Sequence, residues 1–213
     1  MDIRADSGSH ADQSIRADEL PATLGRIEAC HVAPMPVPIQ AALVRRLRDA
    51  GVRLIALDPH DVHMVGHEAG LLALLGEVDL FLPSRAEARQ LHGSDDPEAA
   101  ARAFVTAGPQ AVAIKLGPDG SIVCGRDRVT HHVPAVLARV VDPTGAGDAY
   151  CGGLLAAYSG RANAVAAACH GAVSASFAVE GRGALPLTGV DRAEAARRLA
   201  SILPDKEIPR AHG

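Results

Sequence analysis

The sequence carries little excess charge of either sign. Its 213 residues include 21 Lys and Arg against 25 Asp and Glu, so the formal net charge is only −4. That balance offers no electrostatic basis for binding nucleic acid or an anionic membrane. Apolar residues make up 48% of the chain and charged residues 22%. This composition is typical of a globular domain and excludes wholesale disorder.

Cysteine is scarce, and its spacing excludes the common metal motifs. Cys30, Cys124, Cys151 and Cys169 lie far apart, with no Cys-x-x-Cys pair and no metal-type Cys/His spacing. The ten histidines show no dependable metal-ligand spacing either. We therefore expect buried, reduced thiols in a cytoplasmic protein.

Long apolar runs are almost absent. The first 20 residues contain no apolar core of the kind found in a signal peptide. One uncharged run, residues 162–179, reaches the roughly 18 residues at which a membrane span has to be considered. It is mostly alanine and includes Asn163, His170, Ser174 and Ser176, so we expect a buried helix in a soluble protein.

Apolar segments alternate along the chain with segments of helical periodicity. Strands are expected at residues 26–33, 52–57, 78–82, 111–116, 121–124 and 129–133. Helices are expected at residues 40–50, 68–76, 84–91, 96–107, 146–159, 162–179 and 191–203. Strands that are apolar throughout and are separated by helices predict an α/β fold with a mostly parallel sheet. We expect a polar arm over residues 1–25 and one domain over residues 26–213.

Local patterns support several of these elements. Prolines break the chain at residues 34–38, and Gly51 is expected to stop the helix that follows. Ser84 with Glu87 three residues later has the pattern of a capping box. In the last helix, Glu194 lies at helical spacing from Arg197 and Arg198, which indicates a solvated face.

The chemistry is concentrated in residues 140–148, Val-Val-Asp-Pro-Thr-Gly-Ala-Gly-Asp. The valines are interpreted as the end of a strand, followed by a small-residue turn that opens a helix. Gly145 and Gly147 allow close approach of a ligand, and the start of the helix favours an anion. Asp148 would place a carboxylate beside that anion, where it could take a proton from a hydroxyl. A plain tight turn with a first-turn acid fits these nine residues equally well.

Three more segments accompany this motif in a fixed order. Residues 140–148 resemble the second signature of the ribokinase-like sugar kinases of the phosphofructokinase-B type. Residues 78–87 resemble that family's strand and Asn-x-x-Glu element, residues 113–120 its nucleotide turn, and residues 179–184 its closing Gly-Ala segment. The resemblance covers about residues 28–187, and the sequence is identified as a member of the family. It implies a three-layer αβα, ribokinase-like fold.

The resemblance also implies an activity, the transfer of the γ-phosphoryl group of ATP to a hydroxyl of a sugar or related small molecule. Asp148 would be the base, and Gly145, Ala146 and Gly147 would form an anion hole for the transferring group. The nucleotide would contact Ser84, Lys115, Gly117, Gly120 and Ala172.

Metal ions are implied on the same grounds. Glu87 would act through water on the Mg²⁺ that accompanies ATP, a hard ion that prefers oxygen ligands. A monovalent cation such as K⁺ would be held by Asp142, Thr144 and the carbonyls near Ala178, Gly181 and Gly183.

The sequence departs from the family pattern at three places. Ser84 stands where the family usually has Asn, and serine is also a good helix N-cap. The turn Asp58-Pro59-His60 resembles the family's Asp-Pro-Asn element but ends in histidine. The chain also begins beyond the family's N-terminal portion, which carries a first Gly-Gly signature, acceptor-binding residues and a small β lid.

This last departure leaves alternatives open. The chain could be a truncated, non-catalytic relative that binds nucleotide or a partner without phosphoryl transfer, or its start codon could be misassigned. A sheet without its first strands would expose an apolar edge, which favours pairing with another chain and leaves a homo-oligomer open. The acceptor is not named by the sequence, because the residues that would choose it lie mostly in the absent portion.

Overall fold

The structure, a computed structural model, describes residues 14–21, 24, 26–183 and 187–203. Its centre is a six-stranded sheet whose strands lie in chain order. The strands are β1 (Ala29–Val32), β2 (Leu54–Leu57), β3 (Leu80–Phe81), β4 (Ala111–Lys115), β5 (Ser121–Gly125) and β6 (Thr130–Val133). β1 to β4 are parallel, and β5 and β6 continue the sheet in antiparallel fashion. The prediction of a mostly parallel sheet is confirmed.

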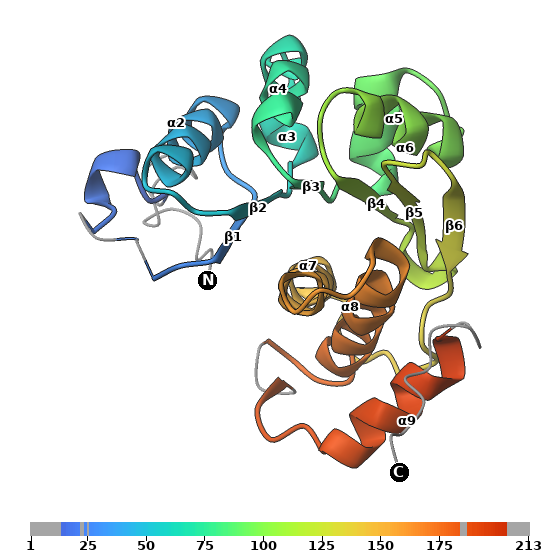
Figure 1. The fold of residues 1–213 in the computed structure, drawn as a ribbon. Helices are drawn as coiled ribbons and strands as arrows, with labels where there is room; N and C mark the ends of the chain where they lie inside the picture. The colour runs from blue at the N-terminus through green and yellow to red at the C-terminus, as the bar shows by residue number, and fades with distance from the viewer. Residues whose placement is uncertain (1–13, 22–23, 25, 184–186, 204–213) are drawn as a thin grey trace, which may run out of the picture.

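Helices cover both faces of the sheet, which gives the three layers of an αβα fold (Figure 1). One face carries α2 (Val37–Asp49), α3 (Asp61–Met64), α4 (Glu68–Leu74), α5 (Arg85–His92) and α6 (Pro97–Thr106). The other face carries α7 (Ala146–Ser159) and α8 (Ala164–Ala178), with α9 (Arg192–Ile202) packed against α8. Short 3₁₀ helices occur at η1 (Ala17–Glu19), η2 (Leu75–Glu77) and η3 (Gly117–Asp119).

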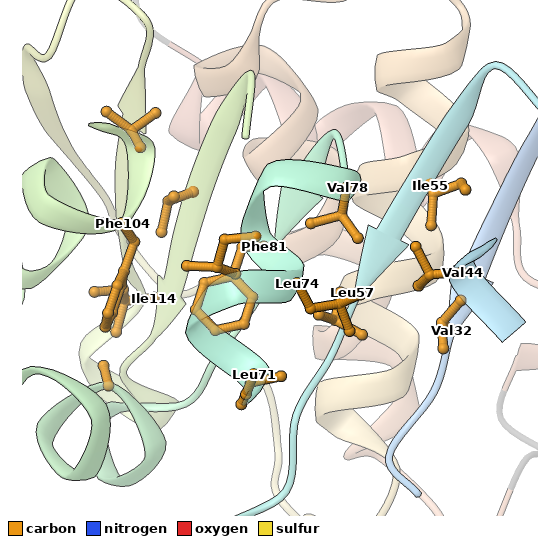
Figure 2. Close-up of a cluster of buried hydrophobic side chains, with 14 of the residues drawn as sticks. Val32, Val44, Ile55, Leu57, Leu71, Leu74, Val78, Phe81, Phe104 and Ile114 are labelled. Atoms are coloured by element: carbon orange, nitrogen blue, oxygen red, sulfur yellow. The ribbon is translucent and has the colours of Figure 1, made fainter. Parts of the chain in front are cut away.

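Strand side chains alternate between two apolar cores. Ile55 and Phe81 point toward the α2–α6 layer, where they join the cluster drawn in Figure 2. Ala56 and Leu80 point the other way and pack with α7 and α8. Because both faces are covered, a charged side chain on a central strand is tolerated only near the strand's end, where partners can reach it.

Helix limits follow from local sequence. The capping box that opens α5 is confirmed, since the Glu87 N–H donates to Ser84 Oγ (3.3 Å) and the Ser84 N–H donates to Glu87 Oε2 (2.6 Å). α7 spans the predicted residues. α2 begins at Val37, earlier than predicted, because Pro38 occupies the first turn, where a missing N–H breaks no helical hydrogen bond. Gly51 follows this helix with φ +79°, as a helix stop requires.

Two expectations about local structure are wrong, and one short helix was missed. Val140 and Val141 do not end a strand, since they lie in irregular chain with exposed fractions of 64% and 50%. The Val141 N–H instead donates to the carbonyl of Val179 (2.7 Å). β3 is limited to two residues, and the short helix α3 was not predicted.

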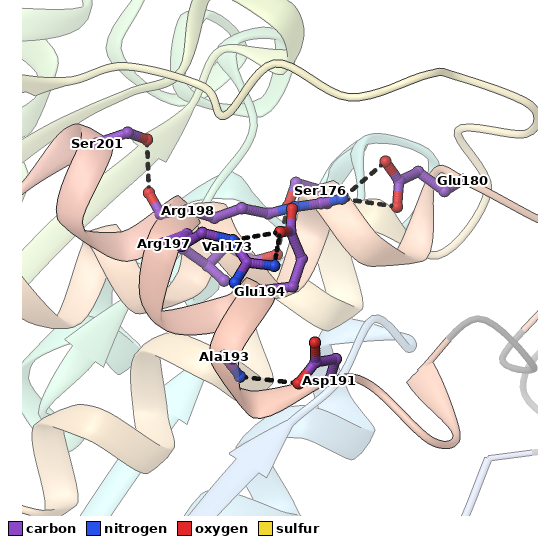
Figure 3. A network of polar contacts seen from close by, with 9 residues as sticks. All are labelled: Val173, Ser176, Glu180, Asp191, Ala193, Glu194, Arg197, Arg198 and Ser201. Atoms are coloured by element: carbon purple, nitrogen blue, oxygen red, sulfur yellow. Dashed lines mark hydrogen bonds and ion pairs between the residues drawn. The ribbon is translucent and has the colours of Figure 1, made fainter.

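The expected solvated face of α9 is only half correct (Figure 3). The Arg197 side chain is 66% exposed, but that of Arg198 is only 14% exposed. Arg198 donates to both carboxylate oxygens of Glu180 (2.9 and 3.0 Å), to Ser176 Oγ (3.0 Å) and to Glu194 Oε1 (2.8 Å). This network ties α9 to the C-terminal end of α8.

The uncharged run 162–179 forms the buried helix α8, as predicted, with Ala167 and Ala168 fully buried. Among the residues that the structure describes, no helix combines the length and the apolar character needed to cross a membrane. At one end of the sheet, β1 has β2 as its only neighbour among the described strands. β1 is thus an edge strand within the described part of the chain.

Helices α7 and α8 approach closely through small residues. A Cβ on Gly153 would collide with the Ser174 side chain and would lie 2.9 Å from the carbonyl oxygen of His170. A Cβ on Gly171 would lie 2.8 Å from the carbonyl oxygen of Tyr150. Gly152 faces open space instead. The distance between these two helices thus depends on particular glycines.

We expect Gly153→Ala to lower the free energy of unfolding by about 1–3 kcal/mol, because the added methyl has to push two packed helices apart. Gly152→Ala is the matched control and should be neutral or stabilising by up to about 1 kcal/mol, since alanine favours the helix and has room. Urea denaturation of both variants measures the difference. Equal stabilities would contradict the packing described above.

Candidate active site

The first turn of α7 carries the motif that the sequence singles out. Gly145 precedes the helix with φ +81°, a left-handed conformation that residues with a Cβ rarely adopt. α7 therefore begins at Ala146, and the first N–H groups of a helix have no carbonyl partner within it. Asp148 lies in this turn with an exposed side chain. The start of α7, where a helix favours an anion, and an accessible carboxylate are thus side by side.

A polar cluster (His31, Asp58, Lys115 and Cys151) lies between the sheet and α7. Lys115 Nζ donates to both carboxylate oxygens of Asp58 at 2.7 Å. Cys151 Sγ lies 3.6 Å from Lys115 Nζ and 3.4 Å from Asp58 Oδ2. Ligand atoms of His31, Asp58 and Cys151 lie within 4.8 Å of one another. The cluster therefore joins side chains from the carboxyl ends of β1, β2 and β4 to Cys151 on α7.

This polar cluster lies directly beneath the α7 motif. An ideal Cβ built on Gly147 would lie 3.7 Å from Lys115 Nζ. Cys151 follows Asp148 by three residues, so both lie on neighbouring turns of one side of the helix. The lysine amine is thus the cation nearest to the predicted anion hole among the contacts described.

Burial dominates the electrostatics of the cluster. It raises the pKa of Asp58 to about 6, although Lys115 acts to lower it. For Lys115, burial lowers the pKa, but the Cys151 thiol and Asp58 raise it, and the net direction is upward, so the amine stays protonated. Burial raises the pKa of Cys151 and keeps the thiol neutral. Burial and then Lys115 lower the pKa of His31 against an opposing effect of Asp148, so the imidazole is neutral at neutral pH.

Ser84 and Glu87 lie beside Lys115. Ser84 forms an isolated parallel bridge with Lys115, and the Lys115 N–H donates to the carbonyl of Pro83 (2.8 Å). Glu87 is only 8% exposed, and its charge acts on both Lys115 and Asp58. The Ser84 hydroxyl accepts a hydrogen bond in the helix cap. Glu87 also takes part in this cap, and its carboxylate lies close enough to the polar cluster to affect its charges.

Both glycines of the expected nucleotide turn have positive φ angles, which glycine adopts readily. Gly117 is the first residue of η3 and has φ +62°, and Gly120 directly follows η3 with φ +87°. A Cβ on Gly120 would collide with the carbonyl of Val133 and would lie 2.8 Å from Ala135 N. Ala172, the other expected nucleotide contact, is 7% exposed and packs in the core between the sheet and the α7–α8 layer.

The residues expected to hold a monovalent cation come from two segments that the structure brings together. The N–H groups of Val141 and Asp142 donate to the carbonyl of Val179 at 2.7 and 3.2 Å. The Thr144 N–H donates to Asp142 Oδ1 (2.9 Å), and this bond lowers the pKa of Asp142. Gly183 has φ +63°. Gly181 lies between this residue and the end of α8.

A cavity of about 550 Å³ opens beside Asp148. Thr144, Gly152, Ala178 and Gly183 are among the residues that line it. Most of the lining side chains are small, and Asp148 is the charged one among the described residues that form the cavity. The volume lies in the range typical of small-molecule sites.

Sequence patterns alone did not find the polar cluster. They assigned Cys151 to packing and His31 to a structural or surface role, and they gave Lys115 only a nucleotide contact. The available signal was the polar residue that ends an apolar strand, Asp58 after β2 and Lys115 in β4. Carboxyl ends of parallel strands share one edge of a sheet, where ligand sites of open α/β sheets lie.

Comparison with known proteins supports the kinase resemblance. Residues 11–188 match the model of the pfkB family of carbohydrate kinases. The chain belongs to this family. A cytidine kinase from Thermococcus kodakarensis is 32% identical over 130 residues, which cover 61% of this chain and 47% of that kinase. The pfkB-family chain thus spans about half the length of this relative.

Solved structures agree on the fold. A nucleoside kinase from Burkholderia thailandensis, in complex with inosine, matches with a TM-score of 0.71 at 26% identity, covering 88% of this chain and 58% of that one. A nucleoside kinase from Methanocaldococcus jannaschii, described as an archaeal member of the ribokinase family, matches with a TM-score of 0.70 at 23% identity, over 87% of this chain and 60% of that one. The ribokinase-like fold implied by the motifs is confirmed.

The lowered pKa of His31 predicts a loss of stability in acid. Because its folded pKa lies below the ordinary 6.5, the unfolded chain binds the proton more readily. The neutral His31 side chain therefore contributes its full share to the free energy of unfolding above pH 6.5. That share is lost as the pH falls below 6.5 and protons bind the unfolded chain. His31→Gln should therefore lose less stability than the wild type between about pH 7 and pH 5.

Urea denaturation at both pH values measures this effect. His131→Gln, at an exposed histidine of β6, is the control and should keep the wild-type pH dependence. A His31→Gln variant with the wild-type dependence would contradict the assignment.

Proposed function

We propose that this protein is an ATP-dependent kinase that transfers the γ-phosphoryl group to a hydroxyl of a sugar or nucleoside. The observation that carries the proposal is the exposed carboxylate of Asp148 in the first turn of α7, above the protonated Lys115. The relatives named as cytidine and nucleoside kinases support this acceptor class. ATP as co-substrate and the buried free thiols also favour the cytoplasm.

Asp148 would act as the general base. As the acceptor oxygen forms its bond to the γ-phosphorus, the carboxylate takes the hydroxyl proton, and the bond to the β–γ bridging oxygen breaks to release ADP. The 550 Å³ cavity beside Asp148 has the size to place a sugar or nucleoside hydroxyl there.

The first turn of α7 would stabilise the transferring group. Negative charge spreads over the equatorial oxygens of the phosphoryl group during transfer. The backbone N–H groups of Gly145 and Gly147 are fixed before the reaction and could stabilise this charge without reorganisation, whereas the Ala146 N–H would first have to leave the carbonyl of Pro143 (3.2 Å). Lys115, whose charge is balanced by Asp58, would add an ammonium N–H donor from below.

The remaining nucleotide contacts would come from the adjoining loops. Gly117 and Gly120 let the backbone of the η3 turn approach the phosphates and ribose, and Ser84 lies beside the same strand end. Ala172 on α8 is only 7% exposed, so adenine would meet it only at the edge of the core. Each of these contacts is proposed from the family resemblance together with the positions described above.

The residues present also fit two kinds of cation. Glu87 uses Oε2 in the helix cap, which leaves Oε1 as a hard oxygen ligand for water on Mg²⁺. Mg²⁺ would supply neutralisation of the phosphate charges. Asp142, Thr144 and the carbonyls near Ala178, Gly181 and Gly183 would hold K⁺, and the hydrogen bonds to the Val179 carbonyl hold the two segments together.

Nucleotide binding without transfer is a second candidate, because the chain spans only 47% of the cytidine kinase. The base, the anion hole and Lys115 favour catalysis. Turnover separates the two candidates directly, as described below.

Mg·ATP should stabilise the chain in a thermal melt. A ligand that binds only the folded state adds about 2.7 kcal/mol at 100 times its Kd. We therefore expect a cooperative transition that moves to higher temperature as Mg·ATP is added, while Mg²⁺ alone serves as the control. A cooperative transition whose midpoint temperature does not change when Mg·ATP is added would contradict both candidates.

Asp148→Asn should abolish ADP release and leave Mg·ATP binding largely intact, because the amide keeps the shape of the side chain but accepts no proton. ADP release is measured over pools of sugars and nucleosides. Asp49→Asn removes the same charge from the exposed end of α2 and should keep wild-type turnover. Turnover in the Asp148 variant would refute the assigned base, and a wild type without turnover on any pool would favour the non-catalytic candidate.

A further inference from the structure

Asp58 and Lys115 form a buried ion pair over the carboxyl ends of the sheet. Lys115 Nζ donates to Oδ1 and Oδ2 of Asp58 at 2.7 Å each. The side chains are only 15% exposed for Lys115 and 4% exposed for Asp58. β3 lies between β2 and β4, so the pair reaches across the end of an intervening strand. The carboxylate therefore fixes where the long, flexible lysine side chain ends.

A pair of this kind needs an explanation, because removing two charges from water costs folding free energy that their attraction does not always repay. Apolar side chains of similar size could fill the same space without that cost. Asp58 has little access to a ligand of its own, since its oxygens face Lys115 and Cys151. A role that acts through Lys115 accounts for the carboxylate.

The lysine amine is directed at the start of α7. An ammonium group has three N–H donors, and two of them meet Asp58. The other acceptor within reach is Cys151 Sγ at 3.6 Å, and sulfur is a weak acceptor. The position that a Cβ would take on Gly147 lies 3.7 Å from the amine. The amine thus keeps capacity for a stronger acceptor at the first turn of α7.

A divalent metal ion is the competing occupant, since His31, Asp58 and Cys151 are grouped closely enough to share one. Lys115 argues against it, because its charge already neutralises Asp58 and a metal ion would have to displace the amine. The third N–H of the amine, which meets only the weak acceptor Cys151 Sγ among the contacts described, instead favours an oxygen acceptor above the cluster.

We propose that Asp58 is a positioning residue that holds the Lys115 amine beneath the first turn of α7, where the amine stabilises the terminal phosphoryl group of a nucleoside triphosphate. The inference rests on the proposed function, because that function brings the γ-phosphoryl group to α7. A diphosphate lacks this group, so the pair would set the preference for a triphosphate over a diphosphate.

A double-mutant cycle tests the proposal. Calorimetric titration with Mg·AMP-PNP and with Mg·ADP compares the wild type with Asp58→Asn, Lys115→Met and the double variant. We expect Lys115→Met to weaken Mg·AMP-PNP binding about tenfold or more and to change Mg·ADP binding less than about twofold. Asp58→Asn should lose most of the same preference. The double variant should bind no worse than Lys115→Met alone, because Asp58 acts only through the lysine.

Folding is controlled within the same series. The double variant removes both buried charges and is expected to fold even where a single variant does not. If Asp58→Asn does not fold by circular dichroism, Asp58→Glu replaces it, since the added methylene keeps the charge but moves it, and a reduced preference for the triphosphate is again expected. Glu98→Gln, which breaks the exposed pair with Arg102 on α6, is the control and should bind both nucleotides as the wild type does.

The outcomes that would contradict the positioning role differ from the one that would contradict the proposed function. Unchanged discrimination in the Asp58 variant, losses that multiply in the double variant, or equal losses for both nucleotides would overturn the positioning role and leave the proposed function standing. A folded wild type that binds neither nucleotide would overturn the proposed function and this inference together.

Discussion

Coverage of the sheet on both faces is the constraint on which the rest of this molecule depends. Strand interiors are apolar on both sides, with Ile55 and Phe81 in one core and Ala56 and Leu80 in the other. Charged groups are therefore confined to the strand ends, where a helix N-terminus can meet them. The location of the site is thus a consequence of burial, and its chemistry is a consequence of which residues end the strands.

The close packing of α7 and α8 serves the same site. Gly153 and Gly171 remove the side chains that would hold the two helices apart. α7 can then lie low over the sheet, so that its first turn reaches the amine of Lys115 and its second turn places Cys151 against Asp58. The left-handed Gly145 sets the point at which the helix begins. Small residues in this region are therefore part of the geometry that presents Asp148.

Local features of the fold could be predicted from sequence because they depend on neighbours in the chain. The limits of α7, the capping box at Ser84 and the stop at Gly51 are of this kind. Val140 and Val141 were misassigned because strand formation needs a partner strand, which the sequence does not place. The early start of α2 reflects the tolerance of a first helical turn for Pro38.

The candidate site was predictable in part for a related reason. Asp148 and the anion hole lie in one continuous segment with a recognisable pattern. The pair formed by Asp58 and Lys115 joins residues 57 positions apart, and only the register of three strands brings them together. The contact between Lys115 and Cys151 depends in addition on how α7 crosses the sheet. These are tertiary contacts, and no local pattern specifies them.

The charges around the first turn of α7 show why a nucleotide would enter with its metal ion. Asp58 cancels the charge of Lys115, while His31 and Cys151 are held neutral. Glu87 and Asp148 then leave the site with an excess of negative charge, against which the helix N-terminus offers only about half a positive charge. A bare triphosphate would meet net repulsion there. A divalent cation bound to the phosphates would offset that repulsion, so Glu87 and Asp148 would favour a nucleotide that carries its metal ion.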